Sequence, residues 1–320
     1  YYEKVIPNIE GLTKDQLVPI CLEQLFQENK IEADRIITAM PGQYTSSRIL
    51  SFNFSDSRKI EAAVYAEIED SVPYDLDEMI LDHQIIGSEG KKTKVLAVLT
   101  KKHFVASFLS HLQCVDIDPK LVDVDSLAFY NLVPYLKDLS TESCSAIVDI
   151  GHEKTSVCLV QKGSLQMFRS INIGGRYLTE FLSKDLAISY HEAQRVKHRV
   201  SCIQIKKNSP DYESLSAEDK LVAEKITVAL KPLVRELGRT LYAFKKSQTA
   251  PLDKVFLSGG TSLIQSIDEL IFEDLGTKVV KTDFDGEKLK INSELNSQKP
   301  LLVQGIGISL RAVGFSKKLS

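Results

Sequence analysis

The feature that most constrains the fold is a run of three short strands separated by tight turns. The strands are expected at Ser145–Ile150, Thr155–Gln161 and Ser164–Ile171. The first is almost wholly apolar, as in a strand buried on both faces. Turns at Gly151–Lys154 and Lys162-Gly163 reverse the chain each time, which predicts an antiparallel meander. Gly174-Gly175 then leads into a helix, so the pattern indicates an α/β protein with mixed sheets.

The first half of the chain predicts a separate α/β unit. An amphipathic helix is expected over residues 12–29, and Ile36–Met40 reads as a short strand. A strand from Arg48, a helix, two strands and a further helix follow, and a strand around Leu121–Val124 closes this compact unit. The chain opens at Tyr1, without a methionine, in an apparent strand Tyr1–Ile6, and we expect it to have lost its start.

The second half continues with helices after the meander. Ser189 is the expected N-cap of one helix, with Glu192 completing a capping box, and Ser216 opens a long helix that Pro232 could kink. A strand ends in Ser258-Gly259-Gly260, and a helix is expected from Thr261 to Leu275. The last expected helix is Leu302–Arg311.

Composition excludes several classes of function. The chain has 320 residues, 43% of them apolar and 26% charged, with a net charge of −3. Its basic residues are dispersed, which argues against nucleic acid as a partner. No apolar run reaches the length of a membrane span. The five cysteines lack C-x-x-C spacing, which favours buried free thiols over disulfide or metal chemistry.

Three motifs could carry chemistry. Asp149-x-Gly151-x-x-x-Thr155 is a hairpin whose backbone N–H groups could meet an anion and whose Asp149 could hold hydrated Mg²⁺. Gly259-Gly260 would let a ligand approach a strand end and a helix N-terminus. Gln194 and Lys197 share a helix face that could touch a ribose or base. Taken singly, an ordinary hairpin turn explains the first motif at least as well, and a simple strand-to-helix turn and a solvated helix face are the preferred explanations of the other two.

Together the three motifs resemble the second half of the actin-like ATPase fold. Asp149, Gly151 and Thr155 meet that family's phosphate-2 pattern, and Gly259-Gly260 meets its adenosine loop. Ala193 and Lys197 meet its A-E-x-x-K helix, with Gln194 where Glu is usual. The resemblance implies an actin-like (ribonuclease H-like) two-domain fold that binds ATP and Mg²⁺.

Four longer phrases narrow the resemblance to the PilM family, with the GspL cytoplasmic domain as a close competitor. They are Glu61–Tyr74 with Asp77 and Asp82, Arg169–Gly175 with Leu178-Thr179, Ile188-Ser189 with Glu192-Ala193 and Lys197, and Gly305–Arg311. PilM-like proteins work in type IV pilus machines and bind the N-terminal tail of the membrane protein PilN. GspL works in type II secretion with membrane subunits such as GspM and contacts the motor ATPase GspE.

The resemblance also implies a division of the chain and a location. The expected parts are 1–48 and 125–142 for core domain I, 49–124 for the small α/β insertion that FtsA also carries, 143–302 for core domain II, and 303–320 for a C-terminal helix that packs back on domain I. The protein is then expected in the cytoplasm at the inner face of the bacterial inner membrane. It would contact the membrane through partners or through a segment outside this chain, and could form a homodimer.

The chain departs from the family pattern at the phosphates. The first phosphate hairpin is absent, and His152, Glu153 and Lys154 replace small residues in the second. Glu153 places negative charge where phosphates would lie, so ATP binding is expected to be weak or absent. A scaffold that is not an enzyme is therefore expected. The rivals are a sugar kinase or phosphatase on the same fold, which would need an acidic base and both hairpins, and a filament-forming FtsA-like protein.

Overall fold

The structure, a computed structural model, describes residues 2, 4, 6–7, 9, 11–73, 75–140, 142–204, 210–247, 251–289 and 291–312. The predicted strand Tyr1–Ile6 falls largely outside this set. The chain forms two compact units, Tyr1–Asp125 and Ser126–Ser320. Within the described residues, no helix combines the length and the apolar character that a bilayer span requires.

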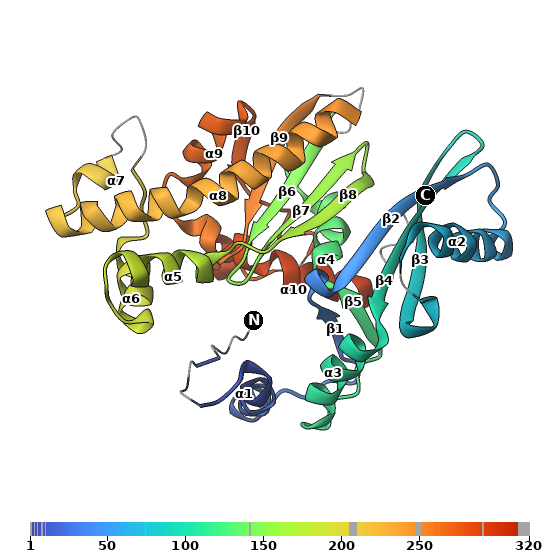
Figure 1. The fold of residues 1–320 in the computed structure, drawn as a ribbon, viewed down its shortest axis with the longest axis horizontal. Helices are drawn as coiled ribbons and strands as arrows, with labels where there is room; N and C mark the ends of the chain where they lie inside the picture. Colours follow the sequence, from blue (N-terminus) through green and yellow to red (C-terminus); the bar gives the residue numbers. More distant parts are fainter. Residues whose placement is uncertain are drawn as a thin grey trace. The chain divides into compact units, whose positions relative to one another are not determined.

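A five-stranded mixed sheet forms the centre of the second unit, with strand order β10-β9-β6-β7-β8 (Figure 1). Its strands are β6 (Cys144–Ile150), β7 (Thr155–Gln161), β8 (Ser164–Ile171), β9 (Leu252–Ser258) and β10 (Lys278–Lys281). β6, β7 and β8 are antiparallel, whereas β6, β9 and β10 are parallel. The predicted meander is confirmed. β10 was not predicted.

Helices cover both faces of this sheet. α5 (Gly175–Asp185), α6 (Tyr190–Val200), α8 (Ala217–Ser247) and α9 (Ile267–Leu275) bury one face in a large apolar core. That core includes Val148, Ile150 and Leu257 from the strands and Leu230 and Leu237 from α8. α10 (Lys299–Ala312) packs beside β9 and crosses α4 (Asp125–Leu132) where Gly307 meets Ala128. A short helix, α7 (Pro210–Glu213), precedes α8 within the predicted polar loop.

Local sequence signals explain where several helices begin. The Ser189 hydroxyl accepts a hydrogen bond from Glu192 N at 3.1 Å, which confirms it as the N-cap of α6. The Glu192 side chain pairs with Arg195. Ser216 caps α8 in the same way by accepting from Asp219 N at 3.1 Å. Both starts follow the rule that a short polar side chain satisfies an otherwise unpaired first-turn amide.

In the part of the first unit that the structure describes, two small sheets are accompanied by the helices α1, α2 and α3. β2 (Thr45–Phe52), β4 (Lys92–Lys101) and β3 (Met79–Glu89) form an antiparallel sheet in that order, and α2 (Ser57–Ser71) packs on one face of it. β1 (Ile37–Met40) and β5 (Leu121–Val124) form a parallel pair. α1 (Lys14–Asn29) and α3 (Lys102–Gln113) contact each other.

Three sequence expectations differ from the structure. β5 pairs with β1 and does not join the three-stranded sheet that precedes it. The packing of the apolar side chains, and not proximity in sequence, determines which strands pair. The helix expected from Thr261 begins only at Ile267, after the 3₁₀ turn η4 (Gly260–Leu263), since Ser266 adopts a left-handed φ of 65°. All five cysteines are free, but Cys114 is exposed rather than buried.

Candidate functional site

Two of the predicted motifs meet at one edge of the sheet in the second unit. Asp149, next to the end of β6, pairs in register with Ser258, the last residue of β9. The strands are parallel, so the hairpin after β6 and the Gly-Gly loop after β9 leave the sheet at the same edge. Asp149, Gly151, Gly259 and Gly260, which the resemblance assigns to a nucleotide site, therefore lie near one another, and their role in binding a nucleotide stays a prediction.

The hairpin turn is tied to the start of α5 by its own carbonyl groups. Gly151 O accepts hydrogen bonds from Gly175 N at 2.9 Å and from the Thr261 hydroxyl at 3.0 Å. His152 O accepts from Arg176 N at 2.8 Å. Gly151 N is used within the turn, where it donates to Lys154 O at 3.0 Å. The positive end of α5 is therefore directed at carbonyls of the protein itself.

Glycine is required where these segments approach closely. Gly259 has a φ of 85°, and a Cβ there would lie 2.5 Å from Ile150 O and 2.9 Å from Asp149 Oδ1. A Cβ at Gly174 would lie 2.6 Å from His152 O. Since real Cβ atoms do not approach backbone oxygens this closely, both positions exclude a side chain.

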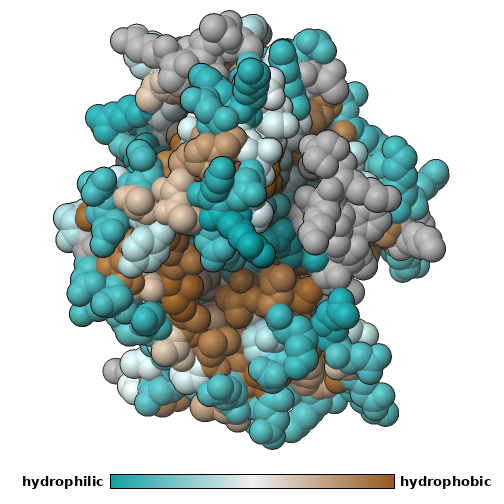
Figure 2. All heavy atoms as spheres, turned by 90° about the vertical axis from the view of Figure 1, so that its right-hand side faces the viewer, coloured by the Kyte–Doolittle hydropathy of each residue, from teal (hydrophilic) through white to brown (hydrophobic). Residues whose placement is uncertain are grey.

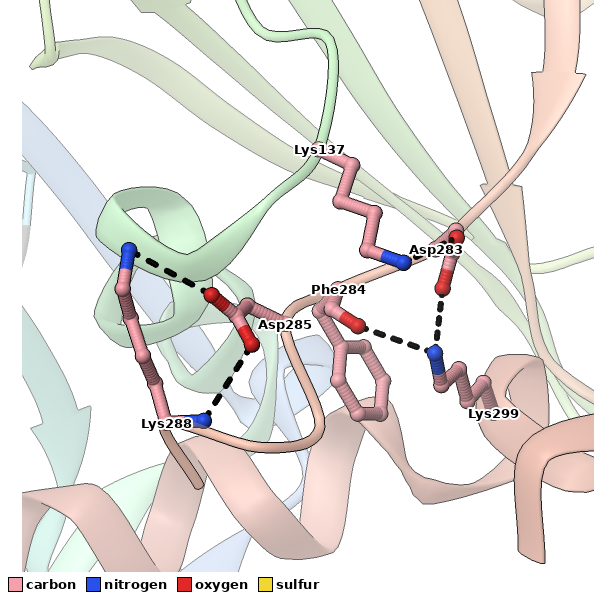
Figure 3. A network of polar contacts seen from close by, with 6 residues as sticks. All are labelled: Lys137, Asp283, Phe284, Asp285, Lys288 and Lys299. Atoms are coloured by element: carbon pink, nitrogen blue, oxygen red, sulfur yellow. Dashed lines mark hydrogen bonds and ion pairs between the residues drawn. The ribbon is translucent and has the colours of Figure 1, made fainter. Parts of the chain in front are cut away.

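The Gly-Gly loop is held from its other side by the first turn of α10. Gly259 N donates to Pro300 O at 2.9 Å, and Gly260 lies beside Leu301. Lys299, next to Pro300, donates to Asp283 Oδ1 at 2.5 Å and to Phe284 O at 2.9 Å (Figure 3). A second lysine, Lys137, lies 3.1 Å from Asp283 Oδ2. The backbone donor of Gly259 is thus occupied by α10.

Thr155 and Lys197 have structural partners in this arrangement. Thr155 is fully buried and donates from Oγ1 to Ile173 O at 2.7 Å. The Lys197 ammonium is buried and donates to Gly175 O at 2.9 Å and to Thr179 Oγ1 at 2.7 Å. Burial lowers the pKa of Lys197 to about 8, because the charged form loses hydration. Both side chains stabilise the start of α5 and the segment before it.

Gln194 differs from Thr155 and Lys197 in its contacts. Its side chain is half-buried on α6, and within the described part of the chain no hydrogen bond joins it to the other predicted site residues. The predicted pairing of Gln194 and Lys197 on one ligand-facing surface stays a prediction for Gln194. For Lys197 the described contacts are internal.

The charge of Glu153 is balanced within the turn region. Its carboxylate lies 3.0 Å from Arg176 Nη1, and Arg176 Nε lies 3.5 Å from Glu180. Arg176 thus offsets the negative charge that the sequence placed near the phosphate position.

The sequence did not predict that Thr261 and Thr179 contact the hairpin turn and the start of α5. Thr261 joins the Gly-Gly loop to the hairpin, and Thr179 receives Lys197 while donating to Gly175 O at 3.0 Å. Their spacing in sequence carries no signal for either contact. Gly174-Gly175 did carry one, because adjacent glycines before a helix often mark a close backbone approach.

The predicted site offers Mg²⁺ a single carboxylate, that of Asp149, and offers phosphate backbone amides that are already hydrogen-bonded. Asp149 is half-buried at a strand end, with glycines at 151 and 259 beside its carboxylate, so a hard cation could reach its oxygens. The amides of Gly151, Gly175, Arg176 and Gly259 are already hydrogen-bonded inside the protein. Among the described residues, no group of three or more His, Cys, Asp or Glu side chains could hold a metal. These four amides are therefore not available to bind a phosphate in this arrangement.

Comparison with known proteins defines the class. The chain superposes on the structure titled MreB 5 of Spiroplasma citri bound to AMPPNP with a TM-score of 0.52 and 13% identity, over 98% of this chain and 80% of that one. Cell division protein FtsA of Staphylococcus epidermidis is 23% identical over 259 residues, which are 77% of this chain and 52% of the relative. The chain thus spans about half the length of the curated relatives it matches. The protein has the actin-like ATPase fold, as expected.

The family follows from two further matches. A structure titled PilM-PilN type IV pilus biogenesis complex superposes with a TM-score of 0.74 and 21% identity, over 96% of this chain and 90% of that one. The model of the family of type IV pilus assembly protein PilM matches residues 8–313. The chain belongs to the PilM family.

Proposed function

We propose that this protein is an actin-like adaptor of a type IV pilus platform, located at the cytoplasmic face of the inner membrane. It would link membrane subunits to the cytoplasmic motor, and it would bind ATP weakly or not at all. The observation that carries this proposal is the internal use of the backbone donors around Gly151 and Gly259. A protein that satisfies these donors itself has few left with which to preorganise a phosphate for transfer.

The partner we propose is the short, extended tail of a PilN-type membrane subunit. The similarity of this chain to the structure titled PilM-PilN type IV pilus biogenesis complex supports a PilN-type partner. Among the described residues, β2 and β3 are the outer strands of the three-stranded sheet and β4 is the strand paired on both sides. Outer strands offer unpaired N–H and C=O groups that an extended peptide can join. Ile80 and Ile85 on β3 are 40% and 46% exposed, which adds apolar contact along that edge.

The molecular surface mixes apolar and hydrophilic side chains. In the face drawn in Figure 2, brown apolar side chains gather among teal hydrophilic ones. Such a mixture suits a peptide that contributes both main-chain hydrogen bonds and a few apolar anchors.

A binding measurement tests this proposal. We expect Ile80→Asp to weaken binding of a PilN-type tail peptide by about tenfold or more, because it places a charge at an apolar contact. Val228→Asp on α8 is the matched control, since Val228 is 45% exposed and lies in the second unit. Equal affinity of the Ile80→Asp and control variants for the tail would exclude β3 as its docking site.

A further inference from the structure

A row of polar side chains crosses the five-stranded sheet at one level. Asp149 on β6 is flanked by Ser258 on β9 and by Ser156 on β7. Ser156 is flanked in turn by Ser170 on β8. Residues paired in register point to the same face of a sheet, so these four side chains line one face.

A fifth member continues the row to the far edge. Lys281 on β10 pairs with Leu257 on β9, so Thr282, the next residue, lies beside Ser258. Thr282 N also donates to Leu257 O at 2.7 Å, which fixes this register. Neighbouring strand residues such as Leu257 point into the apolar core, and the row therefore lies on the opposite face.

The two halves of the row differ in how their hydroxyls are satisfied. On the β7–β8 side, Ser126 of α4 lies with its Oγ 3.4 Å from Ser156 Oγ and 3.3 Å from Ser170 Oγ. On the β9–β10 side, Ser258 is 0% and Thr282 is 2% exposed. Within the described residues, neither of these two hydroxyls has a hydrogen-bond partner.

Two adjacent buried hydroxyls that have no hydrogen-bond partner among the described residues indicate a bound polar ligand. Native proteins leave few such groups unsatisfied, and ordered water is the usual partner. A water molecule needs two to four polar contacts, which two hydroxyls and the neighbouring Asp149 carboxylate can supply. One carboxylate with two neutral hydroxyls is a poor set for a tightly held cation, which prefers several charged oxygens.

We propose that Ser258 and Thr282 form a buried hydration site. Ordered water in this site bridges Ser258 Oγ and Thr282 Oγ1 and extends to the carboxylate of Asp149. It completes on the β9–β10 side the hydrogen bonding that Ser126 provides on the β7–β8 side. The inference does not depend on nucleotide binding, because the site exists within the sheet of the second unit alone.

The equilibrium stability of two variants distinguishes a hydrated site from two buried hydroxyls that bind no water. If water bridges them, Thr282→Val and Ser258→Ala each leave that water short of a partner. Each is then expected to raise the equilibrium constant for unfolding about five- to thirtyfold. If the hydroxyls are bare, removing either one relieves an unsatisfied buried group and stabilises the fold. Increased stability in both variants would overturn the proposal.

The chain offers a matched control and a rescue. Ser145 is equally buried, lies on the same strand face and has no hydrogen-bond partner among the described residues, but its register neighbours are Lys254 and Val160. Ser145→Ala is expected to leave stability unchanged or to raise it. Thr282→Ser keeps the hydroxyl and is expected to retain more stability than Thr282→Val.

A crystal structure of the unaltered protein gives the second readout. We expect a solvent peak within about 2.7–3.2 Å of both Ser258 Oγ and Thr282 Oγ1. Crystals soaked in thallium(I) acetate distinguish water from a cation, because a bound alkali-type cation would be replaced and give an anomalous signal. An anomalous peak at this position, or the absence of any solvent there, would refute the hydration site.

Discussion

At the scale of single residues, Gly307 determines how α10 meets α4. A Cβ at Gly307 would overlap the carbonyl of Ala128, and the Asn131 amide donates to Gly307 O at 3.0 Å. We expect Gly307→Ala to destabilise the protein by about 3 kcal/mol or more, since backbone cannot move aside cheaply in a packed core. Urea denaturation measures this.

Gly305, two residues earlier on the same helix, is the matched control. A Cβ at Gly305 would meet nothing within 4 Å. Gly305→Ala is therefore expected to stabilise the helix by roughly 0.5–1 kcal/mol through lower chain entropy in the unfolded state. Similar effects of the two substitutions would contradict the close crossing of α4 and α10.

Lys197 gives a pH-dependent prediction at the same scale. Its pKa falls from 10.5 to about 8 on folding because burial disfavours the charged form. The unfolded chain then binds more protons between these values, so stability rises with pH across that window and the full penalty applies below it. The shift corresponds to an energy on the order of 3 kcal/mol.

Substitution isolates this contribution from other groups that titrate at alkaline pH. Lys197→Met keeps the length of the side chain and removes its charge. We expect the variant to lose the rise in stability between about pH 8 and pH 10.5 relative to the unaltered protein. Unfolding curves across this range measure the difference, and parallel pH profiles would show that Lys197 is not desolvated.

At the scale of elements, Asp283 in the loop after β10 binds Lys299 at the start of α10 and also pairs with Lys137 (Figure 3). Burial alone would raise the pKa of Asp283, but hydrogen bonds from Lys299 and Lys137 hold it below its usual range. Lys299 is only 10% exposed, so loss of its partner leaves a mostly buried ammonium. We expect Asp283→Asn to cost about 1–3 kcal/mol at pH 7.

The pH dependence of this effect follows from the direction of the shift. A carboxyl whose pKa is lowered on folding contributes stability above its unfolded pKa of about 3.9 and loses it as pH falls through the folded value. The difference between Asp283→Asn and the unaltered protein should therefore shrink below about pH 4. Lys288→Met, which removes an exposed partner of Asp285, is the control and should change little.

At the scale of the whole molecule, the fold alone does not decide whether ATP is used. The internal hydrogen bonds of Gly151, Gly175, Arg176 and Gly259 remove four backbone donors from any phosphate site at this edge. Each missing bond to a charged group weakens binding by roughly 1.5–3 kcal/mol. We expect calorimetry to find ATP–Mg²⁺ affinity weaker than millimolar, and steady-state assays to find no phosphate release.

Phosphate release by the unaltered protein and by the Asp149→Ala variant distinguishes an adaptor from an enzyme. If the protein released phosphate steadily, and folded Asp149→Ala protein did not, the adaptor proposal would fail and an enzyme on the same fold would replace it. Micromolar ATP affinity would show that the donors named above are not the ones a nucleotide uses. In either case the tail-binding measurement at Ile80 remains independent of the result.

The sequence by itself determined the local structure of the second unit. The meander after Ser145, the caps at Ser189 and Ser216, and the glycines at 174, 175 and 259 follow from short-range patterns that the structure bears out. Such features depend on residues a few positions apart, where turn geometry and capping act directly. The combination of motifs also indicated the family correctly.

Only the tertiary structure decided which distant residues meet. The pairing of β5 with β1, the contact of Thr261 with Gly151, and the internal partners of Lys197 join segments far apart in the chain. The row from Thr282 through Asp149 to Ser170 needs the register of five strands, which is set when their apolar faces pack together. Local sequence carries no information on that register, because each strand could slide against its neighbour until the core fixes it.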